Sequence, residues 1–420
     1  MGAIIVHPTD PQADASSLTQ AITRANDGDV IFVQPGHYSP TRTGERLPLT
    51  LPPGVSLIGV AASQCIIDGE GQFAPSFNPI ATDLSVLVLG DYSSVCRVTV
   101  TNGGGHGIAV PPGASAIITH TTLSRHGDHG IFLCGVANAT ITYCEFFQNG
   151  LQRFEPALPR GVGARQGHHI FAEARAGQRN QIQVSDNVMR ECFADGLAFI
   201  CFFPEPDAVE FHALVQRNTI EQSERGGLLC SGSFGPSHNK LRLVVTDNIL
   251  RDNKQVGISL IGALPLAAKV PQATNVQALL SGNTISGSPV GLLAQAAIGE
   301  ARQNSCRLTV ESNQFTECSK SAIRLVGAMG MENVKTEGNE LFAFVTRNSL
   351  PEGASSVLVQ GAGGPATGTI QDNTASVRFL SNVSATPPEH GFIISNGLPG
   401  NRADVLSGSQ PATRAQGNIL

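Results

Sequence analysis

The feature that most constrains this fold is a short pattern that recurs along the chain. Each copy has an Asn, an apolar residue just after it and, about nine residues later, a Gly followed by Ile or Leu. The Gly positions lie 23 residues apart at 107 and 130, and 30 to 34 residues apart at 196, 227, 257 and 291. Periods of this length predict stacked coils, because each repeat buries its apolar face against its neighbours. We therefore expect one solenoid rather than several globular domains.

The residue types of the repeat indicate which solenoid. Alternating strands such as Leu243–Val245, with Asn and Gly between them, exclude a helical repeat, which needs a sustained period of about 3.6 residues. At a tight bend Asn tolerates left-handed backbone geometry, and its amide can bond the Asn of the next coil in a ladder. The Asn positions are 187, 218, 248, 283 and 313, and His120 stands in the Asn place further upstream.

The first residues fit a cap for such a stack. Residues 14–26 predict a short amphipathic helix that ends near Gly28, and residues 29–33 predict a strand before a turn at Pro35–Gly36. A helix over the first coil would hide the open edge of the sheet, which otherwise invites aggregation.

Two segments near the N-terminus carry a resemblance to a known family. They read AITRANDGDVIFVQPGHY and LPLTLPPGVSLIGVAASQCIIDGEG. Together with the repeats, over roughly residues 10–345, they resemble the pectate-lyase-like right-handed parallel β-helix superfamily. The opening coil is also similar to a domain family of unknown function. The superfamily includes lyases, hydrolases, epimerases and non-catalytic proteins, so the resemblance implies the fold more than an activity. The calcium-site, catalytic-Arg and paired-Asp motifs of its pectin-degrading members are missing.

The predicted fold is therefore all-β: a single-stranded right-handed parallel β-helix with a short N-terminal capping helix. We expect the β-helix to span residues 1–345, including an insertion loop at 151–180 that breaks the repeat. After residue 345 the pattern fades, so residues 346–420 should hold the last irregular coils and a C-terminal tail.

Charge and composition exclude several classes of partner. The net charge is −6 and no run of Lys or Arg occurs, which speaks against nucleic acid and against an anionic membrane surface. No apolar stretch approaches the roughly 18 residues of a membrane span, and no signal peptide is evident. The nine cysteines form no CxxC pair, so we expect reduced, buried thiols in a cytoplasmic protein.

Chemistry on a β-helix must lie on its outer surface, because stacked side chains fill the interior. Where the coils are aligned on Gly-Ile or Gly-Leu, the preceding residues are His106, His129 and Asp195, and the insertion adds His168. Later coils carry no ionisable residue there. Coils stack about 4.8 Å apart, so these side chains should form a vertical column.

Imidazoles beside carboxylates suit general acid–base catalysis. The predicted catalytic residues are His106, His129, Asp195, His168, Asp128 and His126. Arginines could hold an anionic group, and apolar residues three places after the column positions should form an exposed floor beside it. The predicted substrate-binding residues are Arg125, Phe132, Arg160, Arg165, Ala198 and Leu229.

Three functions remain open at this point. The first is an acid–base enzyme, of the lyase, epimerase or hydrolase type, that acts on a carbohydrate or uronate, as the resemblance implies. The second is an intracellular isomerase, cyclase or dehydratase with a small, partly apolar metabolite, which the free cysteines and apolar floor favour. The third is a non-catalytic binding or scaffold protein. No cofactor is expected; zinc or another divalent metal is the alternative, although a linear column of His converges poorly on one ion.

Overall fold

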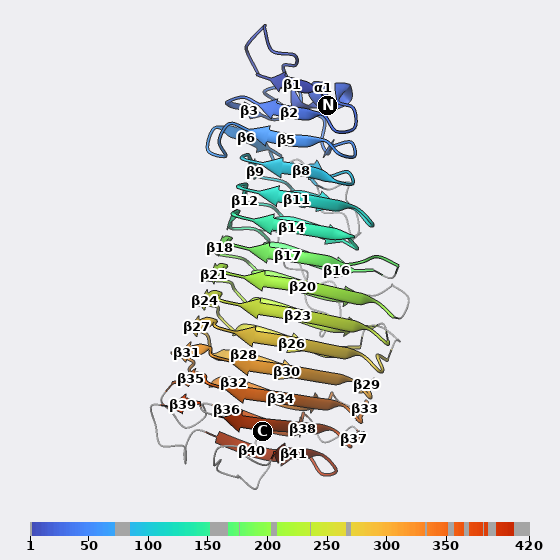
Figure 1. Cartoon of the computed structure of the whole chain (residues 1–420), viewed down its shortest axis with the longest axis vertical. Coiled ribbons are helices and arrows are strands. Elements are labelled where there is room, and N and C mark those ends of the chain that lie inside the picture. Colours follow the sequence, from blue (N-terminus) through green and yellow to red (C-terminus); the bar gives the residue numbers. More distant parts are fainter. Residues whose placement is uncertain are drawn as a thin grey trace. The chain divides into compact units, whose positions relative to one another are not determined.

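The computed structural model is an all-β parallel solenoid of about 11 turns (Figure 1). It describes residues 2–71, 85–151, 167–175, 177–202, 208–235, 237–265, 270–331, 334–351, 357–364, 369–380, 382–384 and 392–406. Contacts divide the chain into two compact units: 1–173 with 178–198, and 174–177 with 199–420. The predicted fold class is confirmed.

The first unit contains three parallel sheets, and every coil contributes one strand to each. The first sheet consists of β1 (Ala3–Val6), β2 (Val30–Val33), β5 (Ser56–Gly59), β8 (Ser93–Cys96), β11 (Ser115–Thr119), β14 (Asn138–Thr142) and β17 (Gln181–Ser185). The second consists of β4 (Leu49–Thr50), β7 (Leu87–Val88), β10 (Ile108–Val110), β13 (Ile131–Cys134) and β16 (Ile170–Ala174). The third consists of β3 (Gly36–Tyr38), β6 (Cys65–Asp68), β9 (Thr99–Thr101), β12 (Thr122–Ser124), β15 (Glu145–Phe147) and β18 (Val188–Arg190).

The predicted capping helix is α1 (Leu18–Arg24), which is the single helix among the residues described. Its N-cap, Ser17, accepts a hydrogen bond from the Gln20 amide and so satisfies one of the free N–H groups of the first turn. The helix packs against β1, β2 and β4. It is shorter than predicted, and the sequence did not indicate the outermost strand, β1. It is also too short to cross a membrane, and the described chain offers no other candidate.

The second unit repeats the same arrangement with longer strands, and the division between the two residue ranges falls within β19 (Leu197–Phe202). Its first sheet consists of β20 (Glu210–Gln216), β23 (Lys240–Thr246), β26 (Asn275–Ser281), β30 (Ser305–Glu311), β34 (Glu340–Thr346), β38 (Thr374–Leu380) and β41 (Arg402–Val405). Its second consists of β22 (Gly226–Phe234), β25 (Val256–Ile261), β28 (Val290–Gln295), β32 (Ser321–Met329), β36 (Val357–Gly363) and β40 (Phe392–Gly397).

The third sheet of the second unit consists of β21 (Thr219–Glu221), β24 (Ile249–Arg251), β27 (Thr284–Ser286), β31 (Gln314–Thr316), β35 (Ser349–Leu350) and β39 (Val383–Ser384). A short fourth sheet consists of β29 (Ala301–Arg302), β33 (Lys335–Glu337) and β37 (Thr369–Gln371). Strands β36, β38, β40 and β41 pair in register within the predicted tail, so its described part is more regular than the faded pattern suggests. The predicted division at residue 345 remains a prediction.

Asparagine ladders hold the corners of the second unit. Each Asn amide donates to the side-chain oxygen of the next Asn at 2.9–3.0 Å, along Asn218, Asn248, Asn283, Asn313, Asn348 and Asn382. A second ladder, which the repeat pattern did not predict, links Asn304, Asn339, Asn373 and Asn401 at 2.8 Å. In the first unit His120 is not in the ladder place: it is exposed with φ 50°, and register puts Thr121 and Cys144 opposite Asn187.

Candidate active site

Strand register in the first unit brings the predicted histidines into equivalent places. Ile108 pairs with Ile131, and Ile131 pairs with Ile170. The residues two places earlier, His106, His129 and His168, therefore occupy the same position on successive coils. All three isoleucines are fully buried in the core, so this register is set by the hydrophobic pattern of the strands.

The three imidazoles are stacked. The ring centroids of His106 and His129 lie 5.0 Å apart with an interplanar angle of 1°, and those of His129 and His168 lie 5.4 Å apart at 22°. His168 is followed by Asp195, whose carboxylate lies 3.7 Å from the His168 Nδ1. The vertical column that the alignment predicted is present in the structure. We call His106, His129, His168 and Asp195 the histidine column.

Asp128 completes this group. Its two carboxylate oxygens lie 3.6 Å from the His106 Nδ1 and 3.4 Å from the His129 Nδ1. The Asp128 and His129 side chains are 18% and 12% exposed, whereas that of His106 is only 2% exposed. Asp128 and His129 are therefore the members of the group that a ligand can reach most easily.

Backbone amides of the next coil contact the column from one side. The amide of His129 donates to the His106 Nδ1 at 3.4 Å, and the amide of His168 donates to the His129 Nδ1 at 3.0 Å. An imidazole nitrogen that accepts a hydrogen bond carries no proton, so the neutral ring of His129 holds its proton on Nε2. The parallel coils thus fix the tautomer of His129 as well as its position.

Aromatic rings pack along the column. The Phe132 ring lies 4.7 Å from that of His106, and the Phe171 ring lies 4.7 Å from that of His129 at an angle of 7°. Phe171 was not predicted as a site residue, although its Ile-Phe pair repeats that of Ile131-Phe132. Glu173, a buried carboxylate two residues further along the same face of β16, was not predicted either.

The apolar floor is present but is not exposed. Phe132 and Ala198 are both fully buried, and Phe132 packs in a cluster with Val88, Ala109 and Cys134. The alternation of the strand correctly placed Phe132 on the face opposite Ile131, yet alternation alone cannot predict whether further segments cover that face. Phe132 and Phe171 pack against the imidazoles instead of forming an open apolar surface. The prediction of an exposed floor at Phe132 and Ala198 was therefore wrong.

His126 has different contacts from the column. Its Nδ1 accepts the Gly103 amide at 3.0 Å and its Nε2 donates to the Val100 carbonyl at 3.1 Å, so both ring nitrogens bond the backbone. Complete burial lowers the pKa of His126 to about 3. The same holds for His169, which bonds Asn149 and the Arg190 carbonyl and whose pKa burial also lowers to about 3. These contacts fit a structural role.

Arg125 and Leu229 are not among the residues that contact the column. Arg125 is exposed at the turn after β12, and its side chain makes no hydrogen bond or ion pair within the described chain. Leu229 is half-buried on β22 of the second unit. Arg160 and Arg165 lie outside the residues that the structure describes.

The donor set of His106, Asp128 and His129 could hold a metal ion, because one ligand atom from each lies within 4.8 Å of the others. Coordination through the Nδ1 atoms of the two histidines would need the lone pairs that now accept the amides of His129 and His168. A metal at those atoms would therefore have to displace both hydrogen bonds.

Comparisons with known proteins agree with the fold. Residues 9–151 match the model of a protein family of unknown function, DUF1565, and residues 84–263 match the model of the right-handed β-helix region. No curated protein matches the sequence.

Among solved structures, the chain is similar to a family 28 exopolygalacturonase from Yersinia enterocolitica: TM-score 0.55 and 10% identity over 98% of this chain and 79% of that one. It is also similar to the catalytic unit of a GH87 α-1,3-glucanase from Streptomyces thermodiastaticus: TM-score 0.51 and 14% identity over 97% of this chain and 68% of that one. Identities this low establish the fold alone. The chain is therefore a right-handed parallel β-helix protein whose structural neighbours are carbohydrate-active enzymes.

Proposed function

We propose that this protein is an enzyme that performs general acid–base chemistry on a saccharide, with Asp128 and His129 as the reacting pair. The observation that carries the proposal is the placement of a partly exposed carboxylate 3.4 Å from a partly exposed imidazole. Such a pair can accept a proton at one group and donate one from the other, as elimination, epimerisation and hydrolysis all require. The structural neighbours support a saccharide as the substrate class.

The rest of the column positions this pair. The His168 amide directs the proton of neutral His129 to Nε2, and the rings of His106, His168 and Phe171 restrict its orientation. Asp195 lies beside His168 and keeps that ring in place. Rigid support of this kind is what keeps catalytic groups in a productive geometry.

A small, partly apolar metabolite is the second candidate. The burial of His106, His168 and Asp195 favours it, because a mostly enclosed column offers little surface to a long polymer. A panel of uronate oligomers, neutral glucans and small hydroxy acids separates the two candidates. We expect turnover with saccharides, measured as new reducing ends or as the absorbance of an unsaturated product.

Substitutions test the pair itself. We expect His129→Gln and Asp128→Asn each to lower kcat by roughly 10²- to 10⁴-fold with the melting temperature retained. His120→Gln is the matched control, because His120 is an exposed histidine of the same unit that lies outside the column. Full activity in both the His129→Gln and the Asp128→Asn variants would disprove the site, and turnover confined to small acids would disprove the substrate class. We also expect activity to survive dialysis against EDTA.

A further inference from the structure

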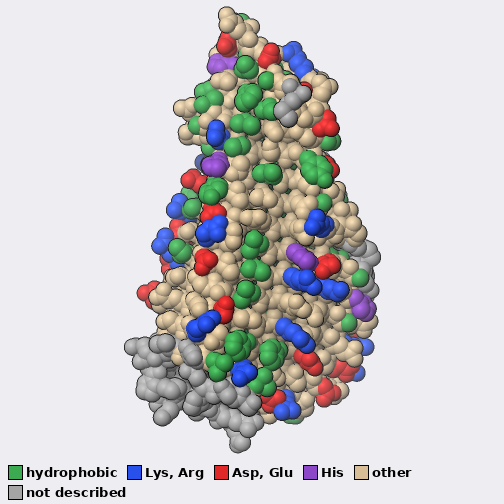
Figure 2. All heavy atoms as spheres, viewed as in Figure 1, with side chains coloured by type: hydrophobic (Ala, Val, Ile, Leu, Met, Phe, Trp, Pro, Cys, Tyr) green, Lys and Arg blue, Asp and Glu red, His purple; other side chains and the backbone are tan. Residues whose placement is uncertain are grey.

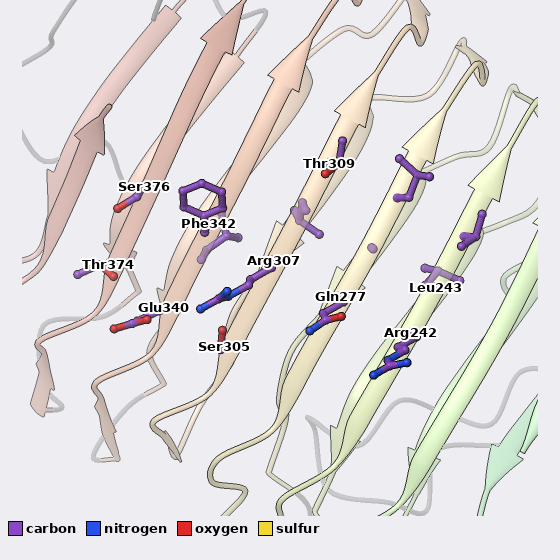
Figure 3. Close-up of a pocket in the computed structure, with 15 residues that line it drawn as sticks. Arg242, Leu243, Gln277, Ser305, Arg307, Thr309, Glu340, Phe342, Thr374 and Ser376 are labelled. Atoms are coloured by element: carbon purple, nitrogen blue, oxygen red, sulfur yellow. The ribbon is translucent and has the colours of Figure 1, made fainter. Parts of the chain in front are cut away.

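The second unit has an open hollow of about 820 Å³ on the outer face of its first sheet. Strands β23, β26, β30, β34 and β38 form its floor, and Figure 3 shows side chains from neighbouring strands projecting on the same side. The hydrogen-bonded register puts Arg242, Gln277, Arg307 and Phe342 opposite one another in one row, with Ser376 next. We call these five residues the arginine row. The arginine row contains neither a residue of the histidine column nor Asp128.

The two arginines of this row are exposed and hold no carboxylate. Elsewhere in the unit, Arg251 pairs with Glu221 and Arg347 pairs with Glu311. Within the described chain, neither Arg242 nor Arg307 has a carboxylate at ion-pair distance. Glu340 is the single carboxylate of the lining, so the hollow has a positive balance in a chain whose net charge is −6.

Spacing and chemistry together indicate the ligand. Adjacent coils lie about 4.8 Å apart, which is close to the length of one sugar ring along an extended chain. Arginine binds carboxylates in a bidentate manner, Gln277 can bond hydroxyl groups, and an exposed aromatic ring can stack on the apolar face of a sugar. Phe342 is 40% exposed and follows Arg307 in the row. Figure 2 shows basic and hydrophobic side chains side by side on this face.

We propose that the arginine row binds an extended acidic polysaccharide that runs across the strands. Carboxylates of the sugar contact Arg242 and Arg307 two coils apart, and the ring beyond Arg307 stacks on Phe342. This surface does not depend on the proposed acid–base chemistry, because none of its residues takes part in the column.

Affinity electrophoresis in gels that contain polygalacturonate tests the proposal, with dextran gels as the neutral comparison. The protein carries His129→Gln throughout, so that turnover does not remove the ligand. We expect polygalacturonate to retard the parent, and the double variant Arg242→Gln/Arg307→Gln to bind roughly three- to tenfold more weakly, with the difference lost at high salt. Phe342→Ala should weaken binding as well.

The double variant Arg251→Gln/Arg347→Gln is the matched control, because it also removes two positive charges, both outside the hollow. It should leave the retardation unchanged. Equal retardation of the double variant and the parent would overturn the proposal, as would equal competition by duplex DNA, which would indicate a general polyanion surface. Binding that persists while the wild-type protein turns over no saccharide would support the row and contradict the proposed function separately.

Discussion

At the scale of single residues, His126 and His169 act as neutral hydrogen-bonding groups inside the coil corners. His126 lies one coil before Asn149, whose side chain accepts the His126 amide in the same way that His126 accepts the Gly103 amide. An imidazole here replaces an Asn while it keeps the donor and the acceptor. The imidazole lowers the stability of the fold only in acid, because a buried imidazole that gains a proton loses its acceptor and carries an uncompensated charge.

The protein should therefore lose stability in acid. The pKa of both histidines falls from 6.5 to about 3 on folding, so the unfolded chain binds more protons between these values. Stability is complete above pH 6.5 and declines towards pH 3, by about 1.4 kcal/mol per pH unit for each histidine. Urea unfolding at pH 7 and pH 5 measures this. His126→Asn should remove about half of this decline, while the exposed His120→Asn should not; an unchanged slope in His126→Asn would contradict the assignment.

Single residues also differ in how far the sequence predicted their place in the site. The column of His106, His129 and His168 followed from the repeat, because register is fixed by the buried isoleucines. The hydrogen bonds of the column could not be predicted from the repeat, since they depend on the neighbouring backbone. His126 and His129 stand three residues apart in the same sequence segment, yet one faces the backbone of the corner and the other the column. The sequence pattern alone does not distinguish them.

At the scale of elements, the ladders contribute the clearest directional interactions. Asn283 donates to the Val245 carbonyl and to Asn313, and its oxygen accepts both the backbone and the side-chain amide of Asn248. The first ladder was predicted because the Asn recurs at a fixed distance from the Gly. The second ladder was not predicted because no Gly stands at a fixed distance from its asparagines. The segment that leads to each of them also varies in length between coils.

Replacement of Asn283 by Ala should be costly. It leaves the Val245 carbonyl and the Asn248 amide buried without their partners, and each such group costs about 1–3 kcal/mol. We expect Asn283→Ala to lower the free energy of unfolding by about 2–5 kcal/mol, as measured by urea denaturation. Asn275→Ala, at the start of β26 in the same coil, half-buried and outside both ladders, should change it by less than about 0.5 kcal/mol. Equal effects of the two substitutions would contradict the importance of the ladder.

At the scale of the whole molecule, none of the nine cysteines is in a disulfide, and seven of them are buried. Their small apolar side chains fill coil positions, as the sequence predicted. Burial raises the pKa of Cys144, Cys192, Cys201 and Cys306 to about 12 and that of Cys318 to about 11. Thiols with such pKa values are almost entirely protonated at neutral pH and react slowly. The cytoplasmic location, where thiols stay reduced, remains a prediction.

Thiol labelling tests this distribution over the entire chain. In the native protein at pH 8 we expect the reagent DTNB to label no cysteine rapidly and only Cys96 and Cys318 slowly, because these two are half-buried. All nine should react at once in guanidinium chloride. A variant with Cys96→Ser and Cys318→Ser should show no native labelling, which separates slow access at those sites from general opening of the coils. Fewer than nine thiols after denaturation without reductant would indicate disulfides and contradict a reduced cytoplasmic protein. Rapid native labelling of a third cysteine would show that the coils open far more readily than their continuous hydrogen bonding implies.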